Sequence, residues 1–369
     1  MEVPFLDLKR QYNSLKPLLN QAVIDVVEEQ YFVKGERVEG FEQQFSSVKT
    51  INHCVGVGNG TDALFITLKM IGIGKGDEVI IPAHGWLSAA EMIKLAGAIP
   101  VFVDVCENSF CMNADLVEQH ITEKTKAIIP IHLYGQMADM KRLEQLAKLH
   151  GLHIIEDCAQ AHFANQDGRP SGSIGIAGTF SFYPSKLLGA FGDAGCIATY
   201  NSDLASKCKA YTNHGELKKN EHLFLGINSR LDALQAAVLS IKLQHVNAWI
   251  TGRNRVADYY SEGLKNLPSV QTPEIMEGNT HDFHLYVIRC ERRNELKEFL
   301  SSKGINTAIH YPNATPYTKA FLGNGYQPED FPVSSRLQSE ILSLPMFSEL
   351  TEIELKYVVK NIRAFYSKN

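Results

Sequence analysis

The sequence lacks the features that would mark a nucleic-acid-binding, secreted or membrane protein. Its 369 residues carry a formal net charge of -5 and no long run of lysine and arginine, so the composition offers no footprint for nucleic acid. No 18 apolar residues follow one another, and Glu2 and Asp7 interrupt the N-terminus where a signal peptide needs an apolar stretch. We therefore expect a cytoplasmic protein that binds neither nucleic acid nor membrane.

Cysteine and histidine are not spaced as metal ligands. The seven cysteines form no C-x-x-C pair, and their odd number favours reduced thiols over a disulfide framework. The thirteen histidines show no H-E-x-x-H or comparable spacing. The sequence therefore predicts no metal site.

Hydrophobic residues are plentiful, at 44% of the chain, and their pattern indicates an α/β fold. From residue 53 to 200, short apolar runs alternate with helical segments, which predicts a mainly parallel sheet covered by helices on both faces, with some antiparallel pairing around 179–183 and 195–200. The pattern of the last hundred residues predicts a smaller α+β unit, with a strand over 305–311 that returns toward the candidate functional site. We expect a large domain with an N-terminal helical segment over 1–246 and a small domain over 247–369.

Two segments of the predicted sheet carry residues that suggest a cofactor. Lys186 lies in F-S-F-Y-P-S-K-L-L-G, where a lysine flanked by apolar residues is costly to bury without a chemical or ionic reason. Lysine can hold an aldehyde cofactor as a Schiff base and move protons as a free amine. Asp157 ends an apolar run, which places its carboxylate at the carboxyl edge of the sheet, where α/β folds bind ligands. Together they predict a pyridoxal phosphate site, with Asp157 beside the pyridinium nitrogen; the alternatives are a buried ion pair for Lys186 and a helix cap for Asp157.

A glycine-rich segment supplies a third element. The stretch C-V-G-V-G-N-G-T-D over 54–62 predicts a short strand, a turn and a helix beginning near Thr61, whose free amides and positive end would bind a phosphate. A turn of this kind also occurs for conformational reasons alone, and the spacing breaks the G-x-G-x-x-G pattern of dinucleotide sites at its last glycine. The three signals in this order are more specific than any one of them.

These segments, with others along the chain, resemble the DegT/DnrJ/EryC1/StrS nucleotide-sugar aminotransferases. The matching segments are V-P-F-L-D-L (3–8), G-T-D-A-L (60–64), E-D-C-A-Q (156–160), S-F-Y-P-S-K (181–186), N-S-R-L-D-A-L-Q-A-A (228–237) and S-L-P-M-F (343–347). The resemblance runs nearly end to end and implies the fold type I architecture of aspartate aminotransferase. The departures are Asn59, Cys158 and Leu187, where serine, alanine and asparagine are common, and none of them removes a group needed for transamination.

The resemblance also implies roles for the matching residues. Gln160 would bind the phenolic oxygen of the cofactor. Trp86 would stack on its ring, and a core or interface position is the rival interpretation for this residue. The phosphate would be bound by Ser181 and by the amides of Gly60 and Thr61. Asn228 would reach the phosphate in a neighbouring subunit, so that a homodimer shares its active sites, although a plain turn residue is the rival interpretation.

Four residues would hold the sugar nucleotide. They are Tyr183, Lys219, His310 and Tyr311. A His-Tyr pair before proline is equally often only the end of an edge strand, and a lysine such as Lys219 can simply be solvated.

We therefore expect an aminotransferase that moves an amino group from an amino acid, L-glutamate, to a nucleotide-linked ketosugar used in surface polysaccharides such as O-antigen. The opening segment over 3–9 and the lysine segment over 181–186 resemble those members of the family that aminate C-3 of a dTDP-3-keto-6-deoxyhexose. The alternatives are amination at C-4 of a dTDP-, UDP- or GDP-4-ketosugar, and a non-catalytic sensor or regulator that binds pyridoxal phosphate. A sugar dehydratase of the same fold is disfavoured, because the resembling dehydratases carry histidine in place of the cofactor lysine.

Overall fold

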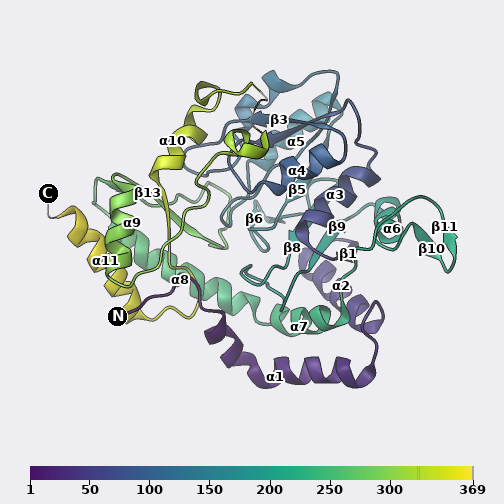
Figure 1. Cartoon of the computed structure of the whole chain (residues 1–369), viewed down its shortest axis with the longest axis horizontal. Helices are drawn as coiled ribbons and strands as arrows, with labels where there is room; N and C mark the ends of the chain where they lie inside the picture. Colours follow the sequence, from purple (N-terminus) through teal and green to yellow (C-terminus); the bar gives the residue numbers. More distant parts are fainter. Residues whose placement is uncertain (322, 324, 368–369) are drawn as a thin grey trace.

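The computed structural model describes residues 1–321, 323 and 325–367, and it has an α/β architecture (Figure 1). Within these residues the main sheet has seven strands in the order β1-β9-β8-β5-β4-β2-β3. The strands from β8 to β3 run parallel, whereas β9 is antiparallel to both β1 and β8. The strands are β1 (His53–Val57), β2 (Glu78–Pro82), β3 (Ile99–Val103), β4 (Thr125–Ile128), β5 (His153–Asp157), β8 (Ala177–Ser181) and β9 (Gly195–Thr199).

Helices cover both faces of this sheet. Successive residues of β2 and β9 are buried although their side chains alternate between the faces, which requires cover on each side. The helices of this part of the chain are α1 (Leu8–Glu29), α2 (Glu36–Lys49), α3 (Gly60–Met70), α4 (Ser88–Leu95), α5 (Met140–His150), α6 (Ser202–Tyr211) and α7 (Ala233–Leu243). The predicted α/β fold, with antiparallel pairing next to the lysine segment, is confirmed.

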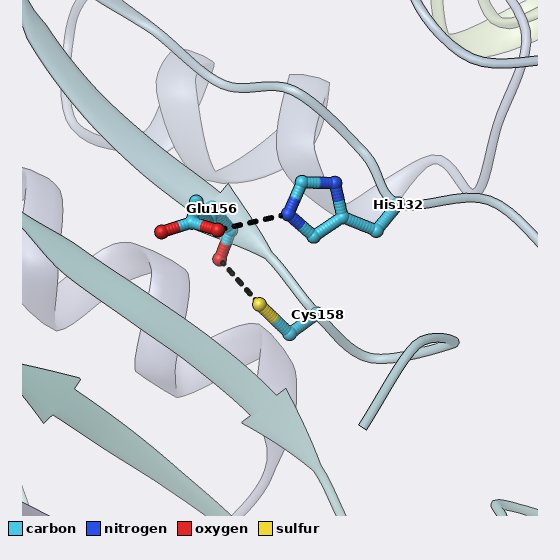
Figure 2. A group of neighbouring side chains, drawn as sticks. All are labelled: His132, Glu156 and Cys158. Atoms are coloured by element: carbon cyan, nitrogen blue, oxygen red, sulfur yellow. Dashed lines mark hydrogen bonds and ion pairs between the residues drawn. The ribbon is translucent and has the colours of Figure 1, made fainter. Parts of the chain in front are cut away.

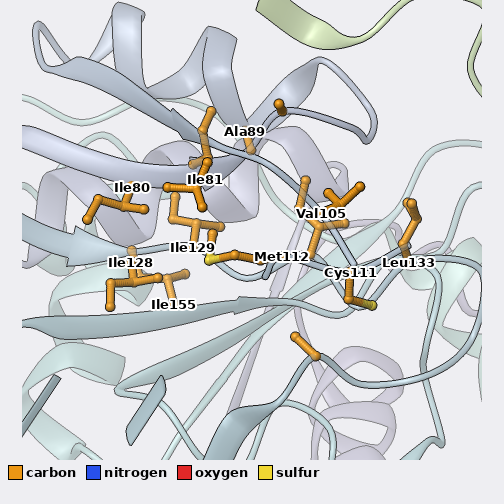
Figure 3. Close-up of a cluster of buried hydrophobic side chains, with 14 of the residues drawn as sticks. Ile80, Ile81, Ala89, Val105, Cys111, Met112, Ile128, Ile129, Leu133 and Ile155 are labelled. Carbon is orange, nitrogen blue, oxygen red and sulfur yellow. The ribbon is translucent and has the colours of Figure 1, made fainter. Parts of the chain in front are cut away.

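The centre of the sheet is packed with branched aliphatic side chains. Ile80, Ile81, Ile128 and Ile155 lie together there, each at most 1% exposed (Figure 3). Branched side chains favour the extended backbone and fill the space between a sheet and its helices. The polar residues that follow these strands are therefore held at the rim of a rigid layer.

A second, smaller sheet lies toward the C-terminus. It is antiparallel, in the order β12-β13-β14, and packs with long helices around the buried rings of Tyr260 and Tyr286. Its elements are α8 (Val246–Leu264), β12 (Val270–Gln271), β13 (Tyr286–Cys290), α9 (Arg293–Ser302), α10 (Pro332–Glu340), β14 (Ile341–Leu344) and α11 (Glu352–Tyr366). The N-terminus also packs here, through a bridge from Val3 to Ile305. The division at residue 246 stays a prediction.

The segment 305–311 differs from the expected strand. It forms only isolated bridges, from Ile305 to Val3 and from Ala308 to Ser343. Because its neighbour changes between these two points, no continuous ladder of hydrogen bonds forms, and the prediction of a regular strand is wrong. His310 and Tyr311 therefore lie beyond the reach of regular pairing.

Two observations concern the chain as a whole. Within the described residues, every helix is too short or too polar to span a lipid bilayer. The seven cysteines are free thiols, most of them buried.

Candidate active site

The lysine and the aspartate predicted from the sequence lie on neighbouring strands. β5 and β8 are parallel and pair Asp157 with Thr179, so both strands end at the same edge of the sheet. Lys186 follows β8 in a short loop that is closed by a 2.7 Å hydrogen bond from Ala190 N to Phe182 O. A buried lysine of α7, Lys242, supports this loop by donating to Gly189 O at 2.6 Å.

Asp157 is a buried carboxylate with few partners. Its Oδ1 accepts a hydrogen bond from Ala159 N at 3.0 Å, and none to Oδ2 is found in the part of the chain that is described. Burial raises the pKa of Asp157, against the opposing effects of the Ala159 amide and of the charge on Lys186. A positively charged group beside Oδ2 would stabilise the ionised form.

Lys186 is a partly buried amine whose pKa is depressed. Removal from water lowers the pKa of Lys186 to about 8, although the attraction of Asp157 works in the opposite direction. At weakly alkaline pH a large share of the amine is therefore unprotonated, which is the form that acts as a nucleophile or base.

The start of α3 lies beside this edge, close to Ser181 at the end of β8. Asn59 caps the helix through its Oδ1, which accepts from Asp62 N at 2.8 Å. The amides of Gly60 and Thr61 lie in the first turn, where no preceding helical carbonyl can bind them. A Cβ atom on Gly60 would come within 2.5 Å of Ser181 Cβ, so only glycine allows this close approach. The amides and the Ser181 side chain therefore lie together.

Ser229, which the sequence analysis missed, forms hydrogen bonds at the start of this helix. Ser229 Oγ donates to Asp62 Oδ2 at 2.7 Å and accepts from Gly58 N at 3.0 Å. The neighbouring Asn228 has an exposed side chain and pairs through its backbone with Asn213. A polar residue after a predicted turn carries no local signal for such a contact, because its partners are far away in the sequence.

Gln160 is held by two contacts across the site. Its Oε1 accepts from Tyr134 N at 2.9 Å, and its Nε2 donates to the Tyr311 hydroxyl at 2.8 Å. The Tyr311 ring lies 5.4 Å from the ring of Trp86, which is 57% exposed. His310 donates to or accepts from Ser343 Oγ through Nδ1 at 2.8 Å, and burial lowers the pKa of His310 to about 4.

Two of the predicted sugar-binding residues are not enclosed by their own chain. Tyr183 follows Ser181 at the rim and is 54% exposed. Lys219 is exposed in the turn between β10 (Glu216–Lys218) and β11 (Glu221–His222), a hairpin that projects beyond α6 (Figure 1). The roles of these residues stay predictions.

A second carboxylate, Glu156, lies on the opposite side of β5 from Asp157. It is fully buried and bonded to His132 Nε2 at 3.0 Å, and Cys158 Sγ donates to its backbone carbonyl (Figure 2). Its carboxylate oxygens also accept backbone amides at 2.7–2.8 Å, from Gly172, Ile174 and Gly175. Burial raises the pKa of Glu156, but the hydrogen bonds from His132 and these amides outweigh it and hold the pKa below its usual value.

The residues His132, Glu156 and Cys158 are close enough to suggest a metal site, but their donor atoms are already in use. His132 Nδ1 accepts from Ala138 N at 3.2 Å, so Nε2 carries the hydrogen and donates to Glu156. Neither ring nitrogen keeps a lone pair for a cation. The cluster fits a hydrogen-bonded structural support.

The sheet topology places a lysine and a carboxylate together beside a helix start. The chain belongs to the DegT/DnrJ/EryC1/StrS aminotransferase family, whose model matches residues 13–363. This confirms the family expected from the sequence.

Several relatives match over nearly their whole length. The chain is 44% identical to a pleiotropic regulatory protein of Geobacillus stearothermophilus, covering 99% of both chains. It is 40% identical to dTDP-3-amino-3,6-dideoxy-alpha-D-galactopyranose transaminase of Aneurinibacillus thermoaerophilus, covering 98% of this chain and 99% of the relative. It is 39% identical to UDP-N-acetyl-3-dehydro-alpha-D-glucosamine 3-aminotransferase of Acidithiobacillus ferrooxidans, covering 98% and 97%.

Solved structures share the fold. S. venezuelae DesV, in complex with a ketimine intermediate, superposes with a TM-score of 0.97 at 39% identity, covering 99% of this chain and 98% of the other. NtdA from Bacillus subtilis, with bound cofactor PMP, superposes with a TM-score of 0.92 at 30% identity, covering 99% and 85%. The expected fold is therefore the fold of known aminotransferases.

Proposed function

We propose that the chain is a pyridoxal-phosphate-dependent aminotransferase that moves an amino group from L-glutamate to a nucleotide-linked ketosugar. The observation that carries the proposal is the meeting of Lys186 and Asp157 at the edge of the sheet, beside the start of α3. The family and the solved relatives with a ketimine intermediate or bound PMP support the same conclusion.

The residues fit this cofactor in three places. The amides of Gly60 and Thr61, with Ser181, would hold its phosphate, because a helix start favours an anion. Asp157, whose Oδ2 lacks a partner in the described part of the chain, would hold a protonated ring nitrogen. When bound, pyridoxal phosphate supplies an aldehyde that an amine can hold and a ring that withdraws electrons from the carbon being deprotonated.

The chain's own groups would then bind, orient and move protons. Lys186 would hold the cofactor and, once released, its Nζ would remove the Cα proton of the amino donor and later run the transfer in reverse on the sugar side. Gln160 would bind the phenolic oxygen, and Trp86 would cover the ring face. Tyr183, His310 and Tyr311 would orient the sugar.

We propose C-3 of a dTDP-3-keto-6-deoxyhexose as the position aminated. Two relatives whose names specify a 3-amino or a 3-dehydro sugar support C-3, although one of these names carries dTDP and the other UDP. The test is glutamate-dependent amination of a dTDP-3-keto-6-deoxyhexose against dTDP-, UDP- and GDP-4-ketosugars, with the amino carbon located by NMR. An amine found only at C-4 would overturn the position and leave the aminotransferase in place.

We further propose a homodimer with shared sites. Asn228 and Lys219 are exposed in their own chain, and Lys219 lies on a hairpin that projects beyond α6, so both are accessible to a second copy. The test is subunit complementation between Lys186→Ala and Asn228→Asp chains. Each variant alone should be nearly inactive, whereas a mixed dimer regains one intact site and measurable turnover. A failure of the mixture, with both variants folded, would contradict shared sites.

A regulatory role is the second candidate, supported by the name of the 44% identical relative. A regulator has no need for a lysine that can move protons. Steady turnover of glutamate and a ketosugar would decide for the enzyme, and its absence with every nucleotide sugar of the panel would favour the regulator.

A further inference from the structure

Tyr134 lies between Gln160, near the edge of the main sheet, and the segment that carries His310 and Tyr311. Its amide donates to Gln160 Oε1 at 2.9 Å, and its carbonyl accepts from Leu285 N at 3.1 Å. Its hydroxyl contacts His84 Nε2 at 2.8 Å and donates a short hydrogen bond to His310 O. The residue is only 3% exposed, so each of its polar groups is used inside the protein.

The backbone around Tyr134 is fixed by a close crossing of two segments. Gly135 has a φ of +129°, and a Cβ atom there would lie 2.7 Å from Phe283 N. Asp282 N donates to Gly135 O at 2.7 Å. Only glycine fits at this crossing, which keeps Tyr134 in place whatever its hydroxyl binds.

Tyr134, Gln160, Tyr311 and His310 form a closed ring of hydrogen bonds. Gln160 Nε2 donates to the Tyr311 hydroxyl, and the peptide from His310 to Tyr311 leads back to the carbonyl that accepts from Tyr134. The amide orientation of Gln160 is thereby set, because its oxygen must face the Tyr134 amide. The ring connects the edge of the main sheet to the segment that carries His310 and Tyr311.

The direction of the hydrogen bonds follows from the chemistry of the atoms. A carbonyl can only accept, so the Tyr134 hydrogen goes to His310 O and His84 Nε2 donates to the Tyr134 oxygen. Burial lowers the pKa of His84 to about 4, which keeps the ring neutral near pH 7. His84 Nδ1 is buried without a partner in the described ranges, so Nε2 is the ring nitrogen that holds the tyrosine.

The segment that receives this hydrogen bond lies outside the regular sheets. Its last bridge is at Ala308, and beyond it His310 is held by Ser343 Oγ and by the Phe5 ring at 5.7 Å. A segment outside a regular ladder opens at low cost in free energy. Two side chains near the edge of the main sheet therefore hold this segment. The Tyr134 hydroxyl binds its backbone at His310 O, and Gln160 Nε2 binds the Tyr311 hydroxyl.

We propose that Tyr134, supported by His84, is a positioning residue that holds the His310–Tyr311 segment in place and thereby orients the ketosugar, but not the amino donor. The inference rests on the proposed function and deepens it. Both substrates react at the cofactor, but the sugar must also be turned so that one carbonyl carbon meets the amine.

The experiment measures the two half-reactions of the holoenzyme separately for Tyr134→Phe. The absorbance of the pyridoxal form falls when L-glutamate is added and returns when a dTDP-3-keto-6-deoxyhexose is added. Each half-reaction is therefore followed separately. We expect kcat/KM for the sugar to fall about tenfold, since one buried hydrogen bond is lost, while the glutamate arm stays within about twofold. Inhibition by dTDP alone should be unchanged, because the nucleotide does not depend on the orientation of the sugar.

Tyr260→Phe is the matched control. Tyr260 is fully buried, and its hydroxyl donates to Pro345 O at 3.0 Å, away from the site. The two variants should lose similar thermal stability, but only Tyr134→Phe should lose sugar turnover. His84→Phe removes the second contact of the Tyr134 hydroxyl and should cause a smaller loss in the sugar arm alone.

Equal losses in both arms, or a sugar arm no worse than in Tyr260→Phe, would overturn the inference. If Tyr134→Phe does not fold, the His84→Phe result decides in the same way. A wild-type protein that transaminates neither substrate would instead contradict the proposed function, so the two failures are distinguishable.

Discussion

Two buried carboxylates lie on opposite sides of β5 near its end, and they differ in their hydrogen bonds and in the direction of their pKa shifts. On one side, Glu156 receives hydrogen bonds from His132 and three backbone amides, and its pKa is lowered. On the other side, Asp157 receives one from Ala159, and burial raises its pKa. A buried charge with a full set of partners supports the structure, whereas one with a free oxygen is available to a ligand.

The largest effect should come from Lys186→Ala, on the Asp157 side. Turnover of glutamate and the ketosugar should fall by about a thousandfold or more, because the group that moves the proton is gone. Lys49→Met is the control, since this buried lysine donates to His162 O and Ser171 Oγ. It should lower stability and keep turnover. Full activity in Lys186→Ala would contradict a chemical role for Lys186 on the Asp157 side.

Asp157→Asn should cost about a hundredfold or more in kcat, because a neutral amide no longer stabilises a charged ring nitrogen. Its thermal midpoint should stay close to that of the wild type, since the folded protein holds this charge at a cost. Steady-state kinetics and thermal unfolding check the two parts. A loss of only a few fold would mean that another group supplies this charge.

Glu156→Gln should show the reverse pattern. One carboxylate oxygen becomes an NH2 group facing amide donors, so the free energy of unfolding should fall by about 2–4 kcal/mol. The pKa of Glu156 is lowered in the folded protein, so its contribution is complete above the unfolded value near 4.5 and is lost as the pH falls through the folded value. Urea unfolding at several pH values should therefore show a weaker acid dependence in the variant. Unchanged stability with lost turnover would break the comparison.

The smallest effect concerns the pKa of Lys186 in cofactor-free protein. Reaction of its amine with a small acylating reagent, followed by peptide mass spectrometry, should show a midpoint near pH 8. Asp157 raises this pKa, so Asp157→Asn should move the midpoint to lower pH, whereas Glu156→Gln should leave it nearly unchanged. A shift to higher pH in Asp157→Asn would contradict the assigned interaction.

Much of the site could be predicted because its residues follow local patterns. Asp157 ends a run of apolar residues, and Gly60 and Thr61 open a helix after a glycine turn. The antiparallel strands beside Lys186 were also expected. The irregular course of 305–311, where a strand was predicted, could not be read from local patterns, because its pairing depends on Val3 and Ser343, which are distant in the sequence.

The α/β fold and the placement of Asp157 at the end of a strand follow from the pattern of apolar residues. Because side chains alternate along a strand, Glu156 then points to the opposite side. Only the tertiary structure decided which of these carboxylates is fully bonded. It also revealed Tyr134, His84 and Ser229 as partners of the site. The reason is the distance along the chain: the Tyr134 bonds to Gln160 and His310 span 26 and 176 residues. Such contacts leave no periodic signal and form only when strands pair and loops pack.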